Sequence, residues 1–310
     1  MDKFKQLARI KDIYNKGGNI IKYLKGNEAG TQNSLEDILI SYDFQSGSYI
    51  KHFASEIDFK TGYGAALASV IGDLGNFNSI MEAGVGEATT LGSLLPQMKQ
   101  KPSDVFGFDI SWSRLKFARS FLADMDITNA SLFTANLFEI PLSESSIDVV
   151  YTSHSIEPNG GREKEALQEL YRVTGKYLIL LEPSFEFGSP EAQARMKEHG
   201  YVTRLYEAAT ELGYKVIEHR LFGHSANPLN PTGLIIIEKT GEISTPPALK
   251  CPISLTDLEK HNDSLLYSKD SFLAYPVIND IPCLLKENSI LAVHLLSDYA
   301  QFKAANNIMF

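Results

Sequence analysis

A short apolar run that ends in two closely spaced glycines constrains the fold of this chain most strongly. Residues 79–90 read Ser-Ile-Met-Glu-Ala-Gly-Val-Gly-Glu-Ala-Thr-Thr, so a predicted strand leads into Gly84 and Gly86 and then into a helix. Glycine has no Cβ, so a ligand can approach the backbone closely at both positions. A tight turn without a ligand would use the same residues. A dinucleotide-binding fingerprint requires a third glycine where Thr89 stands, so the loop does not support NAD binding.

Short apolar runs alternate with helical stretches from Ile80 to about residue 240, a pattern typical of an α/β sheet wound by helices. The last two strands are joined by the loop 223–232, which is too short for a helical crossover. We therefore expect an antiparallel pair there and one reversed strand at the edge of the sheet. The predicted strands are 79–83, 104–109, 130–134, 147–152, 177–182, 214–221 and 233–239, and the main predicted helices are 88–99, 111–124, 163–174 and 190–212.

The chain divides into four predicted parts. Apolar residues at helical spacing predict a helical segment over 1–75, ahead of the sheet domain at 76–240. The segment 240–249 contains Gly241, Pro246 and Pro247 and is the expected linker. A small α+β unit at 245–290 and a helical tail at 291–310 follow. About 45 residues bury little surface, so we expect this unit to lean on the larger domain.

Composition and charge exclude several classes of protein. The 310 residues are 44% hydrophobic and 22% charged, which is ordinary globular usage. The net charge is −9, which disfavours nucleic acid as a partner and favours a small-molecule substrate. Only Cys251 and Cys283 are present, so a reducing compartment is expected. No long apolar stretch or signal-like start occurs, and we expect a cytoplasmic protein that does not engage a membrane.

Two acidic residues accompany the glycine loop. Glu82 ends the first strand just before Gly84, and Asp109 ends the second, where a carboxylate can accept both hydroxyls of a ribose. Residues 82–88 closely resemble the acidic-x-Gly-x-Gly-x-Gly motif of class I S-adenosylmethionine-dependent methyltransferases, with Ala88 in place of the third glycine. The resemblance spans about 76–240. It implies a Rossmann-like seven-stranded sheet with helices on both faces, and S-adenosylmethionine as the cofactor.

The same resemblance implies which residues bind the cofactor. Glu82 orients its methionine end, Gly84 and Gly86 pass beneath that end, and Asp109 binds its ribose. Asn136 stands where the family usually has an Asp facing the adenine amine, and its side-chain oxygen can accept from that amine. Ile110 and Phe138 are expected to sandwich the adenine, although core packing is an equal alternative. The predicted cofactor-binding set is Glu82, Ala83, Gly84, Gly86, Asp109, Ile110, Asn136 and Leu137.

His154 follows the fourth predicted strand, at the carboxyl edge where open sheets bind ligands. Methyl transfer mainly requires alignment and exclusion of water, but a hydroxyl or amine acceptor must also lose a proton. A base with a pKa near 7 assists that loss, and we predict His154 in this catalytic role. A structural, hydrogen-bonded histidine is the alternative. Glu157 and Asn159 share the loop and are predicted to bind substrate, although the Gly160-Gly161 pair also fits a simple turn.

The segment 41–50 concentrates aromatic and hydrogen-bonding side chains ahead of the sheet. Related methyltransferases often fold such an N-terminal segment over the cofactor and substrate as a lid, and Gly47 would suit a hinge. We predict Tyr42, Gln45 and Tyr49 as substrate-binding residues, with plain surface packing as the alternative.

The segment 251–285 resembles a second family, the small zinc-binding domain that serves as an activator subunit for tRNA and translation-factor methyltransferases. Its Tyr-Pro and Ile-Pro pairs match, at 275–276 and 281–282, but only one of the four family cysteines is present. Serine does not replace a thiolate ligand, so we predict no metal and expect leucine packing to compensate. Cys283 is expected to be a buried apolar residue. The four ligand positions fall on Cys251, Ser254, Ser268 and Ser271, and the leucines are Leu258, Leu265, Leu266, Leu284 and Leu285.

These observations predict an S-adenosylmethionine-dependent methyltransferase that acts on an oxygen or nitrogen of a small polar acceptor, for example a sugar or a nucleotide-linked sugar. Two alternatives remain open. The same chemistry could act on tRNA or protein, with the C-terminal unit used for docking. A catalytically silent binding subunit could use the same fold for assembly.

Overall fold

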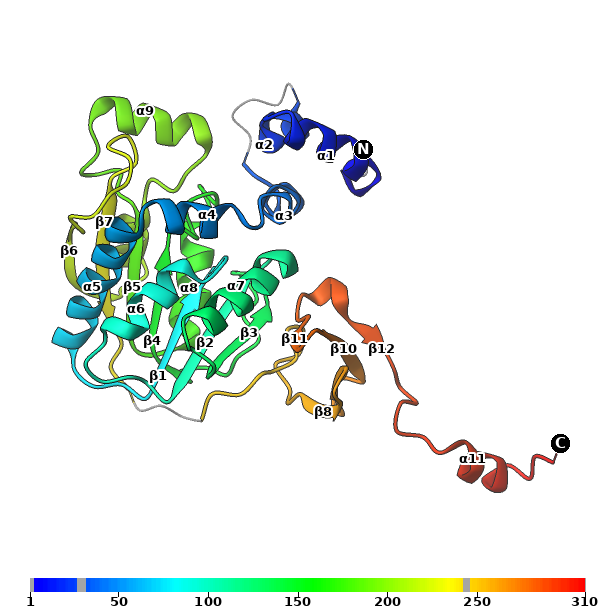
Figure 1. Cartoon of the computed structure of the whole chain (residues 1–310). Helices are drawn as coiled ribbons and strands as arrows, with labels where there is room; N and C mark the ends of the chain where they lie inside the picture. The colour runs from blue at the N-terminus through cyan, green and yellow to red at the C-terminus, as the bar shows by residue number, and fades with distance from the viewer. Residues whose placement is uncertain (1–2, 27–31, 242–245, 310) are drawn as a thin grey trace.

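A seven-stranded sheet forms the centre of the molecule in a computed structural model that describes residues 3–26, 32–241 and 246–309 (Figure 1). The strand order is β3-β2-β1-β4-β5-β7-β6, with β7 antiparallel to both its neighbours and the other pairs parallel. All seven predicted strands are confirmed, as is the α/β fold class. The strands are β1 (Ser79–Ala83), β2 (Asp104–Asp109), β3 (Ala130–Thr134), β4 (Ile147–Ser153), β5 (Thr174–Pro183), β6 (Lys215–Leu221) and β7 (Thr232–Glu238).

Helices cover both faces of the sheet and bury a core on each. Successive strand residues alternate between the two cores, since Ile80 packs with α5, α6 and α7 while Met81 packs with α8 and α10. Because both faces are buried, apolar residues in the central strands occur at consecutive positions rather than only at every second one. The helices are α5 (Ile57–Leu74), α6 (Thr89–Gln97), α7 (Trp112–Asp124), α8 (Glu163–Val173), α9 (Pro190–His199) and α10 (Leu205–Glu211).

The reversed strand is β7, and the prediction that it lies at the edge of the sheet is wrong. β7 sits between β5 and β6, and six of its seven residues are buried. The edge position belongs to β6, which carries Lys215, Glu218 and Arg220 and has no fully buried residue. A strand covered by helices on both faces must be apolar throughout, whereas an edge strand tolerates charge. Hydropathy therefore distinguishes the two positions.

The predicted helix over 190–212 is also wrong in its continuity, because α9 ends at His199 and α10 begins at Leu205. Gly200 has φ +68° and closes α9, with its amide bonded to the Lys197 carbonyl oxygen. Glycine adopts this left-handed conformation without the Cβ penalty and commonly ends helices.

The segment ahead of the sheet is helical in its described part. Ser34 and Asp37 form a reciprocal capping box at the start of α3, and Lys3 pairs with Asp37 at 2.7 Å. The predicted helical segment also includes residues 1–2 and 27–31, which lie outside the described residues. The elements are η1 (Lys3–Gln6), α1 (Leu7–Asn15), α2 (Ile20–Lys25), α3 (Leu35–Phe44) and α4 (Ser48–Ser55).

A small second sheet follows and leans on the larger domain at β3. The Leu284 amide donates to the carbonyl oxygen and to the hydroxyl of Thr134, at 3.2 and 2.9 Å. Leu284 and Cys251 are buried in the same core as Phe133, so the small unit shares the core of the sheet domain. The expected linker includes residues 242–245, which lie outside the described residues. The elements are β8 (Glu259–Asn262), β9 (Leu265–Ser268), β10 (Leu273–Ile278), β11 (Ile281–Pro282), η2 (Lys286–Asn288), β12 (Ile290–Leu291) and α11 (Tyr299–Ala305).

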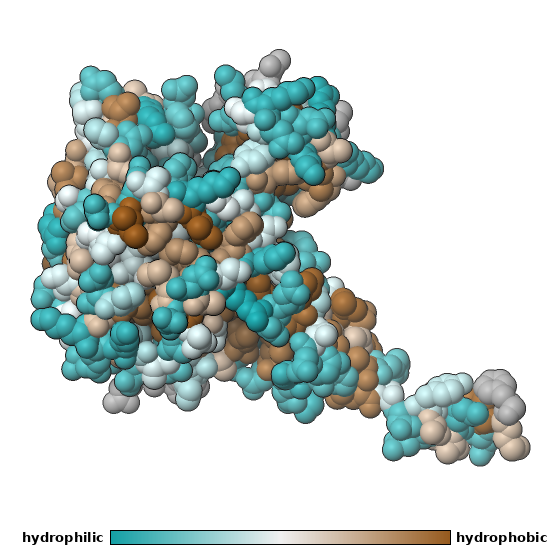
Figure 2. Space-filling model, in the orientation of Figure 1, coloured by the Kyte–Doolittle hydropathy of each residue, from teal (hydrophilic) through white to brown (hydrophobic). Residues whose placement is uncertain are grey.

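The tail that carries α11 projects away from the rest of the molecule (Figures 1 and 2). Figure 2 also shows apolar residues exposed over the small unit, where Leu291 is 73% accessible. Within the described ranges, no helix has both the length and the apolar character that crossing a membrane requires.

Candidate functional site

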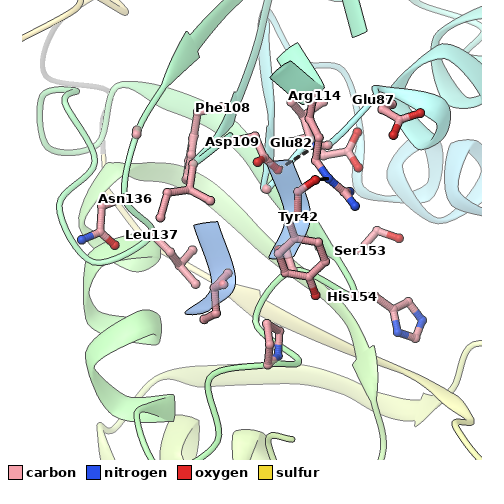
Figure 3. Close-up of a pocket in the computed structure, with 18 of the residues that line it drawn as sticks. Tyr42, Glu82, Glu87, Phe108, Asp109, Arg114, Asn136, Leu137, Ser153 and His154 are labelled. Carbon is pink, nitrogen blue, oxygen red and sulfur yellow. Dashed lines mark hydrogen bonds between the residues drawn. The ribbon is translucent and has the colours of Figure 1, made fainter. Parts of the chain in front are cut away.

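A pocket of about 890 Å³ opens at the carboxyl ends of β1 to β4, where open α/β sheets bind ligands. Figure 3 shows Asn136 and Leu137 at one end of it and His154 at the other, with Tyr42 between. Seven of the eight predicted cofactor-binding residues line the pocket. They are Glu82, Gly84, Gly86, Asp109, Ile110, Asn136 and Leu137. Ala83 does not line it, because its side chain is buried in the core.

The loop after β1 holds a conformation that favours glycine. Gly84 has φ +71° and Gly86 has φ +53°. A Cβ on Gly84 would lie 2.2 Å from the Cβ of Ser155, so the loop touches the segment after β4 with no room for a side chain. Ala88, which replaces the third glycine of the motif, is also left-handed at φ +58°. The loop therefore keeps the shape of the glycine motif at a cost of about 1–2 kcal/mol at Ala88.

Asp109 ties the glycine loop to the end of β2. One carboxylate oxygen accepts from the Gly86 amide at 3.0 Å, and the other accepts from the Ser111 amide at 2.8 Å. Burial raises the pKa of Asp109, although the charge of Arg114 and both amide bonds oppose that rise. The carboxylate is thus fixed at the pocket wall, where a ribose bound in front of it would meet both oxygens.

Glu82 is a buried carboxyl at the floor of the pocket. The Tyr151 hydroxyl donates to it at 2.9 Å, and burial raises the pKa of Glu82 to about 8 despite that bond. A cation placed beside this group would favour its charged form. Glu82 is therefore suited to bind an ammonium, the group that the methionine end of the expected cofactor presents.

The opposite end of the pocket is built by the segment after β3. The Asn136 side-chain oxygen accepts from the Phe138 amide at 3.2 Å, so the amide nitrogen of Asn136 has no part in this turn. Ile110 and Phe138 both line the pocket. The guanidinium of Arg162 lies 3.5 Å from the centre of the Phe138 ring and occupies one of its faces. An adenine could therefore contact only the other face.

His154 lines the end of the pocket opposite Asn136 (Figure 3), and each of its ring nitrogens forms a hydrogen bond. Nδ1 is 2.7 Å from a Glu157 carboxylate oxygen, and Nε2 is 2.9 Å from the Thr232 hydroxyl. Burial lowers the pKa of His154, but the hydrogen bond and charge of Glu157 and the charge of Glu182 raise it above its ordinary value overall. A carboxylate on Nδ1 orients the ring and stabilises its charged form, which suits Nε2 to accept a proton.

Glu182, at the end of β5, fixes the loop that carries His154. Its carboxylate accepts from the backbone amides of Ser155, Ile156 and Glu157 at 3.0–3.1 Å. Burial raises the pKa of Glu182 to about 7, against the charge of His154 and the amide bonds. The Glu182-Pro183 pair thus positions the loop, and the positive φ of His154, +56°, is part of the shape it imposes.

The segment predicted as a lid contributes Tyr42 and Tyr49 to the pocket lining. It contacts the glycine loop after β1 and the first turn of α7. The Arg114 guanidinium lies between the rings of Tyr42 and Tyr49, 4.6 and 4.4 Å from their centres. Glu87, within the glycine motif, accepts from the amides of Gly47 and Ile50 at 2.8 and 2.9 Å. These contacts join the glycine loop and the first turn of α7 to the end of α3 and the start of α4.

Of the three residues predicted to bind substrate in this segment, Tyr42 and Tyr49 line the pocket and Gln45 does not. Its side-chain amide donates to the Ser41 hydroxyl at 2.8 Å and so stays within the end of α3. Residues four apart on a helix face one another, so Ser41 is a local partner of Gln45.

Sequence reasoning missed Arg114, although this buried residue lines the pocket beside Gly86. One terminal nitrogen of Arg114 is buried with no hydrogen-bond partner in the described part of the chain. An anionic or hydroxyl group of a ligand would satisfy it. Together with the glycine cradle and the fixed Asp109 carboxylate, this nitrogen fits S-adenosylmethionine, whose methionine end carries a carboxylate.

A second pocket, of about 1000 Å³, adjoins the first and shares Tyr42, Tyr49, Ser153 and His154 with it. It extends to α5 and to the loop between β6 and β7. Glu157 lines this second pocket, whereas Asn159 lines the first. The two predicted substrate-binding residues of the loop therefore face different cavities.

The four positions that the zinc-domain resemblance implies lie together in one hydrogen-bonded cluster. The Ser271 hydroxyl contacts the Cys251 sulfur at 3.6 Å, and Thr256 joins Ser254 and Ser268 at 2.8 and 2.6 Å. The Tyr275 hydroxyl also contacts Cys251 at 3.3 Å. Within the described residues, no group of three or more His, Cys, Asp or Glu side chains could hold a metal ion.

Residues 80–176 match a family model described as a methyltransferase domain. Solved structures similar to this chain include an S-adenosylmethionine-dependent methyltransferase from Aquifex aeolicus, with 17% identity, a TM-score of 0.42, and coverage of 56% of this chain and 88% of that one. Another is magnesium protoporphyrin IX methyltransferase from Synechocystis with bound S-adenosylhomocysteine, with 14% identity, a TM-score of 0.45 and coverage of 75% and 99%.

A third is a Haloferax volcanii complex between a methyltransferase activator and a methyltransferase, with 14% identity, a TM-score of 0.45 and coverage of 54% and 84%. No curated protein matches the chain. The matched segment contains the glycine loop, Asp109, Asn136 and His154. The chain therefore carries a methyltransferase domain of the S-adenosylmethionine-dependent class, with S-adenosylmethionine as its cofactor.

Proposed function

We propose that this protein transfers a methyl group from S-adenosylmethionine to an oxygen or nitrogen of a small polar acceptor, with a sugar or a nucleotide-linked sugar as the first candidate. One observation carries the proposal. The cofactor pocket and the second pocket share lining residues, and His154 is one of them. An acceptor seated in the second pocket would present its nucleophile to both the methyl group and His154.

The cofactor would supply a methyl group on a sulfonium. Asp109 would hold its ribose, Glu82 its ammonium, and Asn136 its adenine amine, so that the sulfur faces the second pocket. Tyr42 and Tyr49 would close over this arrangement, because Arg114 and Glu87 join the lid segment to the cofactor loops. Excluding water and fixing the two reactants side by side supply most of what an in-line displacement requires.

His154 would act as the general base. Glu157 holds Nδ1 and stabilises the imidazolium, so Nε2 can accept the proton of an acceptor hydroxyl that takes the place of Thr232. Asn230 would help to position the acceptor, since it lines the second pocket beside Glu157. Glu182 would act only through the loop that it holds.

The test uses labelled S-adenosylmethionine and a set of sugars, nucleotide-linked sugars and small hydroxylated or amino compounds. The His154→Ala variant is expected to lose a hundredfold or more in turnover, the usual contribution of a general base, with cofactor affinity unchanged. The variant Thr232→Val, which keeps the ring and its Glu157 partner, is expected to lose much less. Equal turnover in wild type and His154→Ala would contradict the assignment.

We propose the cytoplasm as the compartment in which the protein works. Both Cys251 and Cys283 are buried free thiols, which a reducing compartment preserves. We also propose that residues 76–240 act as the catalytic domain and that residues 1–75 supply its lid.

A further inference from the structure

We propose that the acceptor carries an anionic oxygen group, a phosphate or a carboxylate, and that Lys60 and His224 bind this group in the second pocket. The inference rests on the proposed function, because it concerns the acceptor of that reaction. Lys60 and His224 line the second pocket but not the cofactor pocket, so their ligand would be the acceptor rather than the methyl donor.

Lys60, on α5, is half-buried and has no carboxylate within ion-pair distance in the described part of the chain. Burial lowers its pKa, and the charge of Glu56, one turn earlier, only partly opposes that. A half-buried ammonium without a bonded counter-charge is costly. An anion from a ligand would supply the missing partner.

The loop between β6 and β7 brings further donors to the second pocket. His224 packs within reach of α5, since a Cβ on Gly62 would lie 3.8 Å from its ring. Among the described residues, no hydrogen bond to the His224 ring nitrogens is found. Asn227 accepts the Leu229 amide through its side-chain oxygen at 2.9 Å, which leaves its amide nitrogen as a donor. An ammonium, an imidazole and an amide suit an oxyanion better than a neutral hydroxyl.

The charge balance of the pocket points the same way. Glu157 is the one acidic side chain among the described residues that line it, and its carboxylate is already engaged by His154 and Asn230. Lys60 contacts the Phe59 ring, with its ammonium 5.9 Å from the ring centre, but the described residues offer it no ion-pair partner. The field of the pocket therefore favours an anionic ligand.

Aromatic rings also line the second pocket. They belong to Tyr42, Tyr49, Phe59 and Tyr63, all from the helices ahead of the sheet. Such rings pack against the flat or apolar face of a ligand. The acceptor would thus have a ring body, an anionic group at Lys60, and a hydroxyl or amine near His154.

The experiment measures anion binding to the full-length protein saturated with S-adenosylhomocysteine, by calorimetry. Inorganic pyrophosphate is the phosphate probe, and succinate is the carboxylate probe. Wild type is expected to bind at least one of them, and the anion that binds identifies the source of the charge. Lys60→Met is expected to weaken that binding at least about tenfold, whereas Lys60→Arg keeps it within about threefold.

The matched control is Lys164→Met, which removes the same charge from a lysine on α8 that pairs with Glu211 outside both pockets. It is expected to bind the anion as wild type does. Absence of binding for both probes in wild type, or equal affinity in wild type and Lys60→Met, would overturn the inference. Failure of the proposed function would look different, because wild type and His154→Ala would then show equal turnover whether or not the anion binds.

Discussion

Replacing Gly84 with alanine would test the glycine loop at the point where it touches the segment that carries His154. A Cβ at this position would lie 2.2 Å from the Ser155 Cβ and 2.9 Å from its hydroxyl. Ser155 cannot simply move away, because Glu182 holds its amide at 3.0 Å. The substitution should therefore shift the loop after β4 as well as the glycine loop.

Two costs add at this position. A non-glycine residue at φ +71° costs about 1–2 kcal/mol, and the overlap with Ser155 adds about 1–3 kcal/mol, as for other overpacked sites. At Gly86 only the first cost applies, because the nearest atom to a Cβ there is the flexible end of Arg114 at 3.3 Å. Gly84→Ala should therefore destabilise the protein by about 2–5 kcal/mol, and Gly86→Ala by about 1–2 kcal/mol.

Denaturant unfolding measures both variants, and calorimetry with S-adenosylhomocysteine measures the effect on the site. We expect Gly84→Ala to bind the ligand at least about tenfold more weakly than Gly86→Ala, since the displaced loop forms one wall of the pocket. The double variant Gly84→Ala, Ser155→Gly removes the overlapping atom. It should regain the stability that the overlap with Ser155 costs. The reasoning would be refuted if Gly84→Ala were no less stable than Gly86→Ala, or if the double variant recovered nothing.

Three further predictions concern the carboxyl, the lid and the serine cluster. Burial raises the pKa of Glu82 to about 8 in the free protein, and a bound ammonium would lower it, so binding releases a proton. Affinity for S-adenosylhomocysteine should then rise by up to about tenfold per pH unit between about pH 6 and 7.5. Glu82→Gln should show no such rise in calorimetry, and a flat profile in wild type would contradict the assignment. Arg114→Met removes two cation–π contacts, and hydrogen exchange of residues 42–50 should accelerate at least about tenfold, whereas unchanged exchange would show that Arg114 does not hold the lid. If the zinc-domain resemblance is correct, cysteines at three serine positions should complete a metal site with Cys251, and mass spectrometry of the folded protein should detect one zinc ion in the triple variant but none in wild type. The three serines are Ser254, Ser268 and Ser271.

Much of the sheet could be predicted because its strands carry their own signal. The central strands carry consecutive apolar residues, and Gly84, Asp109 and Asn136 mark where successive strands end. All three lie at the same sheet edge because parallel strands share a carboxyl end. The resemblance to the methyltransferase motif implied eight cofactor-binding residues, and seven of them line one pocket at this edge.

Residues that join separate segments could not be found in this way. Arg114 is a charged residue in the first turn of a helix. The two tyrosine rings that enclose it belong to a segment about 70 residues earlier, so the residues next to Arg114 in the sequence do not predict this contact. Lys60 belongs to a helix that precedes the sheet, and only the fold brings it to the loop between β6 and β7. Such roles depend on contacts between segments far apart in the chain, for which a periodic pattern carries no information.

Gln45 and β7 lie in different places from those expected from the sequence. Gln45 was expected at the site because of its polarity, yet its amide bonds to Ser41 within its own helix. The short loop 223–232 predicted a reversed strand at the edge, yet β7 lies between β5 and β6 and six of its seven residues are buried. A hydrogen bond within the helix accounts for the position of Gln45, and the burial of apolar side chains accounts for the position of β7.

A crystal structure with S-adenosylhomocysteine tests the central claim most directly. The account predicts the ribose hydroxyls at Asp109, the adenine beside Asn136, and the sulfur facing the second pocket at His154. Ligand density at any other place on the molecule, or a sulfur turned away from His154, would contradict it.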